Sequence, residues 1–205
     1  MDIILASTSP RRIEMLSWLD LPYKAVASPL EEKSIRHPDP AQLTRLLAEA
    51  KAQSVASQYS GAVVIGSDTV VSFNGAILEK PHDALEQRNM LHAQRGQQGE
   101  VISSVSVINT VTSETVTHTK VTSYHLANLT DEQIEHYVAS GQGLDKAGGF
   151  GLQDENDLFI KQLDGCYTNA LGFPLCEVKA LLTAAGITVS ADVPLIVQQR
   201  TGRAC

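Results

Sequence analysis

The sequence predicts an α/β protein built on a mixed, twisted β-sheet that is flanked by helices. Two observations indicate this class: β-rich segments alternate with helical ones along the chain, and several neighbouring β-rich segments are joined as hairpins. The chain has 205 residues, of which 43% are hydrophobic and 19% charged, as expected for a globular protein with a sizeable core.

The N-terminal segment has a strand–turn–helix pattern. Residues 3–6 are apolar and predict a short strand, and a polar turn follows. Ser9 is a favourable N-cap, Pro10 suits the first helical position, and apolar residues recur at helical spacing through Leu19. Such an opening directs backbone N–H groups toward any ligand above the turn.

The central segment predicts a helix with an apolar face between residues 43 and 50 and a buried strand at 62–65. We expect this strand to be interrupted at residues 66–68, to resume at 69–71, and to turn back at Asn74-Gly75 as a hairpin.

The remaining elements follow from the same signals. We expect a short strand near 23–27, a helix at 85–92, antiparallel strands at 101–111 and 116–126, a helix opened by a capping box at 130–133, a strand at 158–161 and a helix at 174–185. Residues 1–189 then form one domain. Residues 190–205 lack periodicity, and we expect a loosely ordered tail.

Composition limits the functional classes. The net charge of −7 disfavours nucleic acid as a partner, and no apolar run approaches the ~20 residues that span a membrane. The three cysteines have no metal-binding or disulfide-framework spacing, and the N-terminus does not resemble a secretory signal. These features predict a cytoplasmic protein.

Familiar catalytic motifs are missing. The sequence contains no G-x-x-x-x-G-K-[ST] phosphate loop and no G-x-S-x-G elbow, and its six histidines lack metal-ligand spacing. P-loop NTPases and serine hydrolases are therefore disfavoured.

Arg11 and Arg12 are the first candidate binding residues. They lie in the first turn of a predicted helix, where basic side chains oppose the helix dipole. An anion such as a triphosphate above the helix would explain them. A solvated pair that reaches outward explains the pattern about equally well.

Asp68, Glu32, Lys51 and Lys80 are further candidates. Asp68 interrupts buried apolar residues, so it could bind a metal or accept a proton from water at a sheet edge, or simply cap a turn. Glu32 could bind Mg²⁺ but could also be one of two solvated acids. Lys51 and Lys80 could contact a ligand or lie at the surface.

Seven segments in order resemble the Maf family of nucleotide pyrophosphatases. The resemblance covers residues 3–187 and rests on Ser7-Thr8-Ser9-Pro10-Arg11-Arg12, Glu31-Glu32-Lys33, Ala50-Lys51-Ala52, Gly66-Ser67-Asp68-Thr69, Glu79-Lys80-Pro81, Asp145-Lys146-Ala147-Gly148-Gly149 and Leu171-Gly172-Phe173-Pro174.

This resemblance implies an ITPase-like (Maf) fold with two lobes around a central cleft. It also implies hydrolysis of a nucleoside triphosphate to the monophosphate and pyrophosphate, with a divalent cation (Mg²⁺, Mn²⁺ or Co²⁺) and a homodimer. The implied catalytic residues are Asp68, Glu32, Lys51 and Lys80, with Asp68 as proton acceptor and with Glu32 and Asp68 as metal ligands. The implied substrate-binding residues are Ser7, Ser9, Arg11, Arg12, Thr69, Lys146 and Gln153.

The resemblance also implies a base preference. Arg11, Thr69 and Gln153 match the dTTP/UTP subgroup, and a Gln amide can both donate to and accept from a uracil or thymine edge. Residues 154–156 depart from that subgroup because they are Asp-Glu-Asn rather than Gly-rich. CTP, 7-methyl-GTP or purine nucleotides therefore stay open as substrates. A nucleotide-binding regulator of septum formation and cell division with little turnover also stays open.

Overall fold

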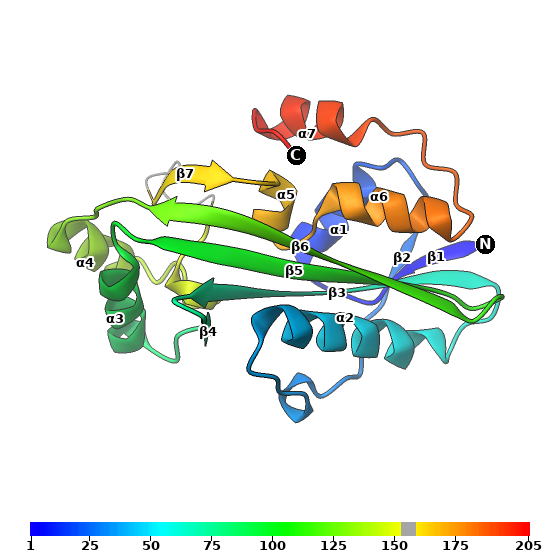
Figure 1. Ribbon diagram of the computed structural model, residues 1–205, viewed down its shortest axis with the longest axis horizontal. Coiled ribbons are helices and arrows are strands. Elements are labelled where there is room, and N and C mark those ends of the chain that lie inside the picture. Colours follow the sequence, from blue (N-terminus) through cyan, green and yellow to red (C-terminus); the bar gives the residue numbers. More distant parts are fainter. Residues whose placement is uncertain (153–158) are drawn as a thin grey trace.

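The computed structural model of the protein describes residues 1–152 and 159–205. These residues form a seven-stranded mixed sheet in the order β2-β1-β3-β5-β6-β7, with β4 also paired to β3 (Figure 1). The strands are β1 (Asp2–Leu5), β2 (Lys24–Ala25), β3 (Ala62–Phe73), β4 (Ala76–Leu78), β5 (Gln98–Asn109), β6 (Glu114–Leu126) and β7 (Ile160–Asp164). Strand β1 is parallel to β2 and β3, whereas the other pairs are antiparallel. The predicted mixed sheet is confirmed.

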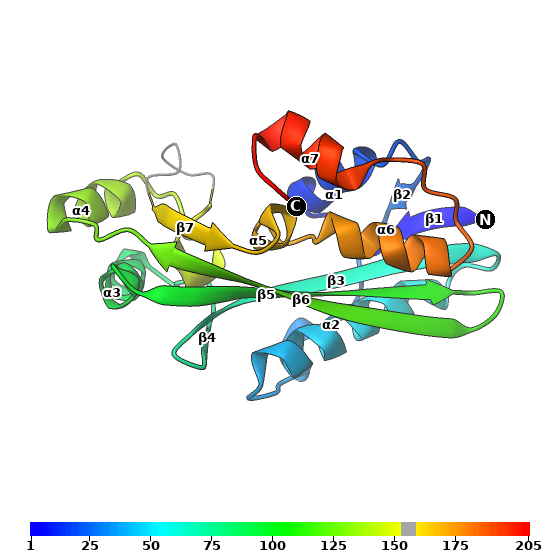
Figure 2. The ribbon, with the colours of Figure 1, turned by 45° about the horizontal axis from the view of Figure 1, so that its top comes forward.

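Helices lie on both sides of this sheet. They are α1 (Pro10–Ser17), α2 (Pro40–Ala56), α3 (Ala84–Gln94), α4 (Asp131–Ala139), α5 (Tyr167–Ala170), α6 (Leu175–Ala184) and α7 (Val193–Thr201), with short 3₁₀ turns η1 (Glu32–Ser34) and η2 (Ala147–Gly149). Helix α2 covers one face, and α1, α6 and α7 lie over the other (Figure 2). Each described helix is too short or too polar to cross a lipid bilayer.

Among the described residues, the hydrophobic core is divided into four clusters. The largest cluster lies between the sheet and α1, α6 and α7 and includes Leu16, Phe173 and Val197. A second cluster joins α3 and α4 to the start of β5 and the end of β6 and includes Leu91 and Tyr137.

Strand β3 runs without a break from Ala62 to Phe73, so the expected interruption at residues 66–68 is wrong. Gly66 explains how a continuous strand fits here. A Cβ atom at Gly66 would lie 2.2 Å from the Ala48 carbonyl oxygen and 2.6 Å from the Ala52 nitrogen. Helix α2 therefore packs directly on the strand backbone, and Asp68 keeps an extended conformation beside it.

The middle of β3 nevertheless forms an open edge. The pairing with β1 ends at Leu5 and Ile65, and the pairing with β4 begins at Val71. Among the described residues, 66–70 have no neighbouring strand on that side. Side chains from both faces of the sheet can reach this gap, which lies beyond the carboxyl end of β1, as ligand sites in α/β sheets commonly do.

The C-terminal segment differs from the expectation of a loosely ordered tail, because residues 193–201 form α7. Asp192 caps this helix by accepting a hydrogen bond from the Leu195 N–H at 3.2 Å. Val193 and Val197, one helical turn apart, are buried in the main core. Ile196 packs against the same core, so α7 has a short i, i+3, i+4 apolar pattern that the sequence analysis did not recognise.

Candidate active site

A cleft of about 920 Å³ opens at the free edge of β3. It is lined by residues from the β1–α1 turn, β3, α2, the η1 loop, the glycine-rich segment before β7 and the turn after α5. Ten expected site residues meet there: Ser7, Ser9, Arg11, Arg12, Glu32, Lys51, Asp68, Thr69, Lys80 and Lys146. Gln153, the remaining expected site residue, lies outside the described residues.

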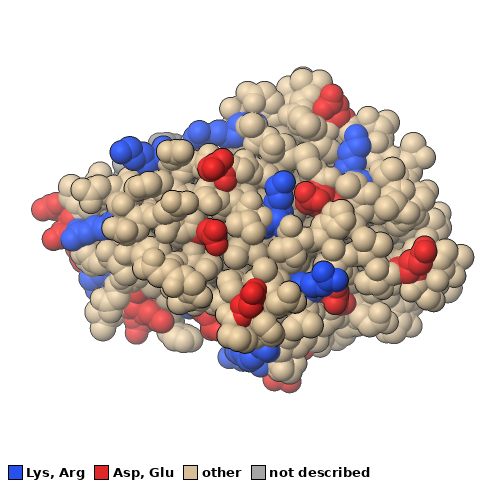
Figure 3. Space-filling view, in the orientation of Figure 1, with Lys and Arg blue, Asp and Glu red and all other residues tan. Residues whose placement is uncertain are grey.

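The cleft gathers positive charge in an acidic protein. Among the described residues that line it, five are basic and three are acidic, although the whole chain has a net charge of −7. On the face seen in Figure 3, by contrast, basic and acidic side chains are scattered among uncharged ones. The local excess of cations suits a polyanionic ligand such as a phosphate chain.

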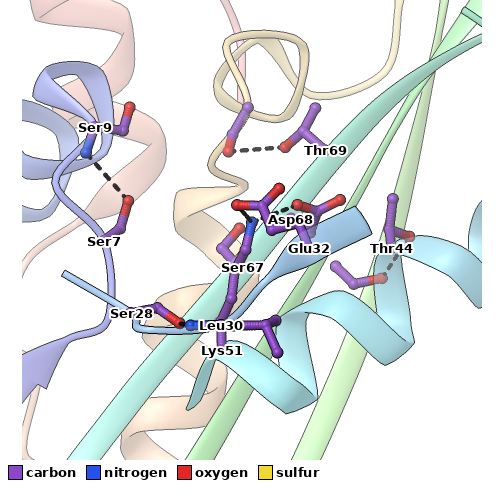
Figure 4. Close-up of polar contacts among 12 residues, drawn as sticks. Ser7, Ser9, Ser28, Leu30, Glu32, Thr44, Lys51, Ser67, Asp68 and Thr69 are labelled. Carbon is purple, nitrogen blue, oxygen red and sulfur yellow. Dashed lines mark hydrogen bonds and ion pairs between the residues drawn. The ribbon is translucent and has the colours of Figure 1, made fainter. Parts of the chain in front are cut away.

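Lys51 joins two carboxylates at the base of the cleft (Figure 4). Its ammonium group donates to Asp68 Oδ1 at 2.7 Å and lies 3.0 Å from Glu32 Oε1. The side chains of Lys51 and Asp68 are each 9% exposed, whereas that of Glu32 is 57% exposed. The buried pair is fixed by the packing of α2 on β3, and Glu32 approaches it from the solvent side.

Burial is the largest influence on Asp68, and it raises the pKa of this carboxyl. The charge and hydrogen bond of Lys51 and the charge of Arg12 oppose that shift, while Glu32 reinforces it. A carboxylate with a raised pKa is a stronger base than an ordinary aspartate. This property suits a group that accepts a proton from water.

Arg12 ties three parts of the chain together. Its guanidinium donates to the carbonyl of Ser67 at 2.8 Å, to the hydroxyl of Thr69 at 3.2 Å and to the carbonyl of Gly172 at 3.1 Å. The Ser67 carbonyl belongs to the open edge of β3, so Arg12 satisfies a group that strand pairing leaves free. Since a guanidinium has five N–H groups, two remain for a ligand.

Thr69 and Gly172 complete this contact. The Thr69 hydroxyl donates to the Gly172 carbonyl at 3.1 Å. Gly172 has a φ of +95°, which is in the region that favours glycine, and a Cβ there would lie 3.4 Å from the Thr69 hydroxyl oxygen. Burial lowers the pKa of Arg12, while the charges of Asp68 and Glu32 counteract that effect.

The two serines of the first turn lie at the mouth of the cleft. Ser9 occupies the N-cap position of α1, but its side chain makes no capping hydrogen bond, contrary to the expected use of that residue. Its N–H instead donates to the Ser7 hydroxyl at 3.2 Å. The Ser9 hydroxyl therefore stays available to a ligand, as do the first amides of the helix. Arg11 is exposed and has no ion pair within the described part of the chain.

The glycine-rich segment forms the opposite wall, where Lys146 pairs with Asp145. Two buried glutamines that the sequence analysis missed hold this segment on α3. Gln87 Nε2 donates to the Gly149 carbonyl at 3.0 Å, and Gln94 Nε2 donates to the Gly148 carbonyl at 2.8 Å. Tyr124, also missed, donates its hydroxyl to Gln94 Oε1 at 2.7 Å. The sequence signal that could have identified these three residues is a polar group on the buried face of a predicted helix or strand.

The donor set at the base of the cleft suits a hard divalent cation. Mg²⁺ is usually held by one or two carboxylates together with substrate phosphates and water. Asp68 and Glu32 already approach a single ammonium group and have oxygens facing the cleft. Within residues 1–152 and 159–205, no group of three or more His, Cys, Asp or Glu side chains is arranged to hold a metal.

Comparison with known proteins places this chain in a family. The profile of the Maf-like protein family matches residues 2–185, which include every expected site residue. The chain belongs to the Maf family. It is 42% identical over 187 residues to a dTTP/UTP pyrophosphatase of Deinococcus radiodurans, covering 91% of this chain and 94% of that one.

Other family members are similar over comparable lengths. A dTTP/UTP pyrophosphatase of Moorella thermoacetica is 39% identical, with 91% of this chain and 96% of that one covered. A nucleoside triphosphate pyrophosphatase of Synechococcus sp. is 36% identical, with 92% and 98% covered. Among solved structures, a HAM1 protein from Coxiella burnetii shares the fold, with a TM-score of 0.53 at 16% identity over 90% of this chain and 99% of that one.

Proposed function

We propose that this Maf protein hydrolyses pyrimidine nucleoside triphosphates, dTTP and UTP in particular, to the monophosphate and pyrophosphate. The observation that carries the proposal is the buried Lys51–Asp68 pair at the base of a cleft rich in basic side chains. The similarity to dTTP/UTP pyrophosphatases at 39–42% identity supports the choice of substrate.

Asp68 is the general base of the proposed reaction. Its carboxylate accepts a proton from a water molecule, and the water oxygen forms a bond to the α-phosphorus. The bond between that phosphorus and the oxygen bridging to the β-phosphate breaks, so pyrophosphate leaves. The raised pKa of Asp68 favours the proton transfer, and general-base catalysis of this kind typically contributes about 10²–10⁴-fold.

The basic side chains neutralise the triphosphate. Lys51, Lys80 and Lys146 act as point charges along the phosphate chain, and Arg12 offers its two remaining N–H groups. The hydroxyls of Ser7 and Ser9 and the N-terminal amides of α1 supply further donors. Phosphoryl-type displacement relies chiefly on such positioning and charge neutralisation.

Asp68 and Glu32 would hold the divalent cation, Mg²⁺, Mn²⁺ or Co²⁺. When bound, the cation supplies positive charge that polarises the phosphate oxygens. Glu32 is the more exposed partner of Lys51, so its carboxylate can turn to a cation without unfolding buried structure. Lys51 then keeps its bond to Asp68.

The choice of base rests on Arg11, Thr69 and Gln153. Thr69, which contacts Arg12 and Gly172, lines the cleft, and this supports a role beside the nucleotide. The preference for uracil and thymine over 7-methylguanine and purines remains part of the proposal. So do a cytoplasmic location, which the sequence features predict, and a homodimer, which the family resemblance implies.

The decisive experiment measures pyrophosphate release from a panel of nucleoside triphosphates with Mg²⁺ or Mn²⁺. We expect turnover of dTTP and UTP that falls at least ~10²-fold in Asp68→Asn. Asp145→Asn, a second acid in the same cleft, is the matched control and retains most of the activity. Turnover of purine nucleotides alone would overturn the base assignment. Tight binding without turnover would favour the regulator of cell division.

A further inference from the structure

The three cysteines of the chain, which are 10 to 39 positions apart, converge on one site. Cys166 is the N-cap residue of α5, Cys176 lies in the first turn of α6, and Cys205 follows α7. The Cys205 sulfur lies 2.7 Å from that of Cys176 and 3.4 Å from that of Cys166. All three are thiols in this structure.

The segment that carries Cys205 is held in place by other contacts. The backbone N–H of Tyr167 donates to the carbonyl of Ala204 at 3.3 Å. Gly202 ends α7 in a left-handed conformation and turns the chain back toward α5 and α6. These two features bring Cys205 back beside α5 and α6.

The three thiols differ in surroundings. Cys166 is 4% exposed, whereas Cys176 and Cys205 are partly exposed. The hydrogen bond with Cys205 lowers the pKa of Cys176, and Lys120 adds to that effect. The hydrogen bond with Cys205 and burial raise the pKa of Cys166. Because the thiolate is the reactive form, the partly exposed Cys176 is better suited to attack an oxidant than the buried Cys166.

We propose that Cys176 and Cys205 form a reversible disulfide, made under hydroperoxide oxidation, that ties the segment after α7 to the start of α6. The assignment rests on the contact between the two sulfurs and on their exposure to solvent. Cys166 remains a thiol behind them. None of the three cysteines is among the described residues that line the cleft, so the site is separate from the proposed nucleotide site.

The chemistry balances with hydrogen peroxide as the oxidant. The Cys176 thiolate attacks one peroxide oxygen, the O–O bond breaks, and hydroxide leaves, giving a sulfenic acid. The Cys205 thiol then attacks the Cys176 sulfur, its proton joins the departing hydroxide, and the S–S bond forms. Two thiols and one peroxide thus give one disulfide and two water molecules.

The test treats the reduced, full-length protein with hydrogen peroxide and then measures free thiols, intact mass and the linked peptides. We expect free thiols to fall from three to one, with a mass loss of two hydrogen atoms and a single Cys176–Cys205 linked peptide. A thiol reductant restores all three. Cys176→Ser and Cys205→Ser should form no intramolecular disulfide.

Cys166→Ser is the matched control and should form the same linkage as the unmodified protein. Thermal unfolding of each reduced variant checks that it is folded, independently of any turnover. In the oxidised protein, the amides of residues 193–201 should exchange with solvent more slowly than in the reduced protein. A linked peptide containing Cys166, an intermolecular disulfide, or only addition of oxygen atoms would overturn the proposal.

Discussion

Lys51 and Asp68 meet at 2.7 Å where helix α2 crosses strand β3, and both side chains are almost completely removed from solvent. Two residues earlier on β3, Gly66 lets the helix backbone approach the strand closely. The distance between Asp68, the proposed base, and the Lys51 ammonium is therefore set by the close backbone contact between α2 and β3.

Replacing Gly66 by Ala should damage both stability and catalysis. The new Cβ would overlap the Ala48 carbonyl and the Ala52 nitrogen, so α2 must move away and carry Lys51 with it. We expect the unfolding free energy, measured by urea denaturation, to fall by about 1–3 kcal/mol, together with a lower kcat. Ala52→Gly should not rescue the variant because the closest atoms are backbone. Full rescue would contradict the backbone contact.

The carboxyl of Asp68 should titrate above the ordinary range of aspartate, which is near pH ~4. Because Lys51 favours the charged form and Glu32 disfavours it, the two neighbouring substitutions should act in opposite directions. Lys51→Gln should raise the pKa of Asp68, and Glu32→Gln should lower it. Carbon-detected NMR titration, without metal, measures the pKa of Asp68 in the unmodified protein and in each of the two variants. Shifts in the same direction would refute this electrostatic account.

Arg12 and Arg11 are adjacent and offer a matched comparison. Arg12→Lys replaces a planar fork that contacts Ser67, Thr69 and Gly172 by a single ammonium. The Gly172 carbonyl keeps the Thr69 hydroxyl as a donor, whereas the Ser67 carbonyl loses the guanidinium. We expect a stability loss of about 1–3 kcal/mol by chemical denaturation. Arg11→Lys should change stability by less than ~0.5 kcal/mol since Arg11 is an exposed surface residue. Equal losses would show that the Arg12 contacts do not stabilise the fold.

The hydroxyl of Tyr124 should stabilise the glycine-rich wall of the cleft from a distance. Burial raises the pKa of this phenol, so it stays a donor to Gln94 at physiological pH. Tyr124→Phe leaves Gln94 Oε1 buried without that donor, and we expect a loss of about 1–3 kcal/mol together with a higher KM for the nucleotide. Tyr59→Phe is the control because the Tyr59 hydroxyl has no hydrogen bond within the described residues. If neither Tyr124→Phe nor Tyr59→Phe changed the KM, Tyr124 would not be a positioning residue.

Much of the fold could be predicted from the sequence, but two elements could not. Hydrophobic periodicity and turn residues were sufficient for the central helix and for the β5–β6 hairpin. The continuity of β3 could not be predicted, because Gly66 indicates a strand break unless the close approach of α2 is known. Helix α7 was missed because its apolar pattern, made by Val193, Ile196 and Val197, spans little more than one helical turn.

The candidate site residues were identified through charged and hydroxyl side chains in recognisable motifs, and ten of them line one cleft. Their partners were harder to predict since many are backbone groups. The Arg12 guanidinium donates to the carbonyls of Ser67 and Gly172, and every residue type carries a backbone carbonyl, so the sequence does not indicate these partners. The sequence therefore suggested only a ligand as the partner of Arg12. The buried amides of Gln87 and Gln94 were overlooked for a related reason, because an uncharged polar residue in a helix has many ordinary explanations.

The Arg12–Gly172 hydrogen bond joins residues 160 positions apart, whereas the Lys51–Asp68 bond joins residues only 17 positions apart. Because a ribosome releases the chain from its N-terminus, α2 and β3 can pair while synthesis is still under way. The other side of the cleft must wait until the turn after α5 has emerged and a long loop has closed. A nascent chain therefore holds the proposed base and its lysine together well before it can enclose a nucleotide.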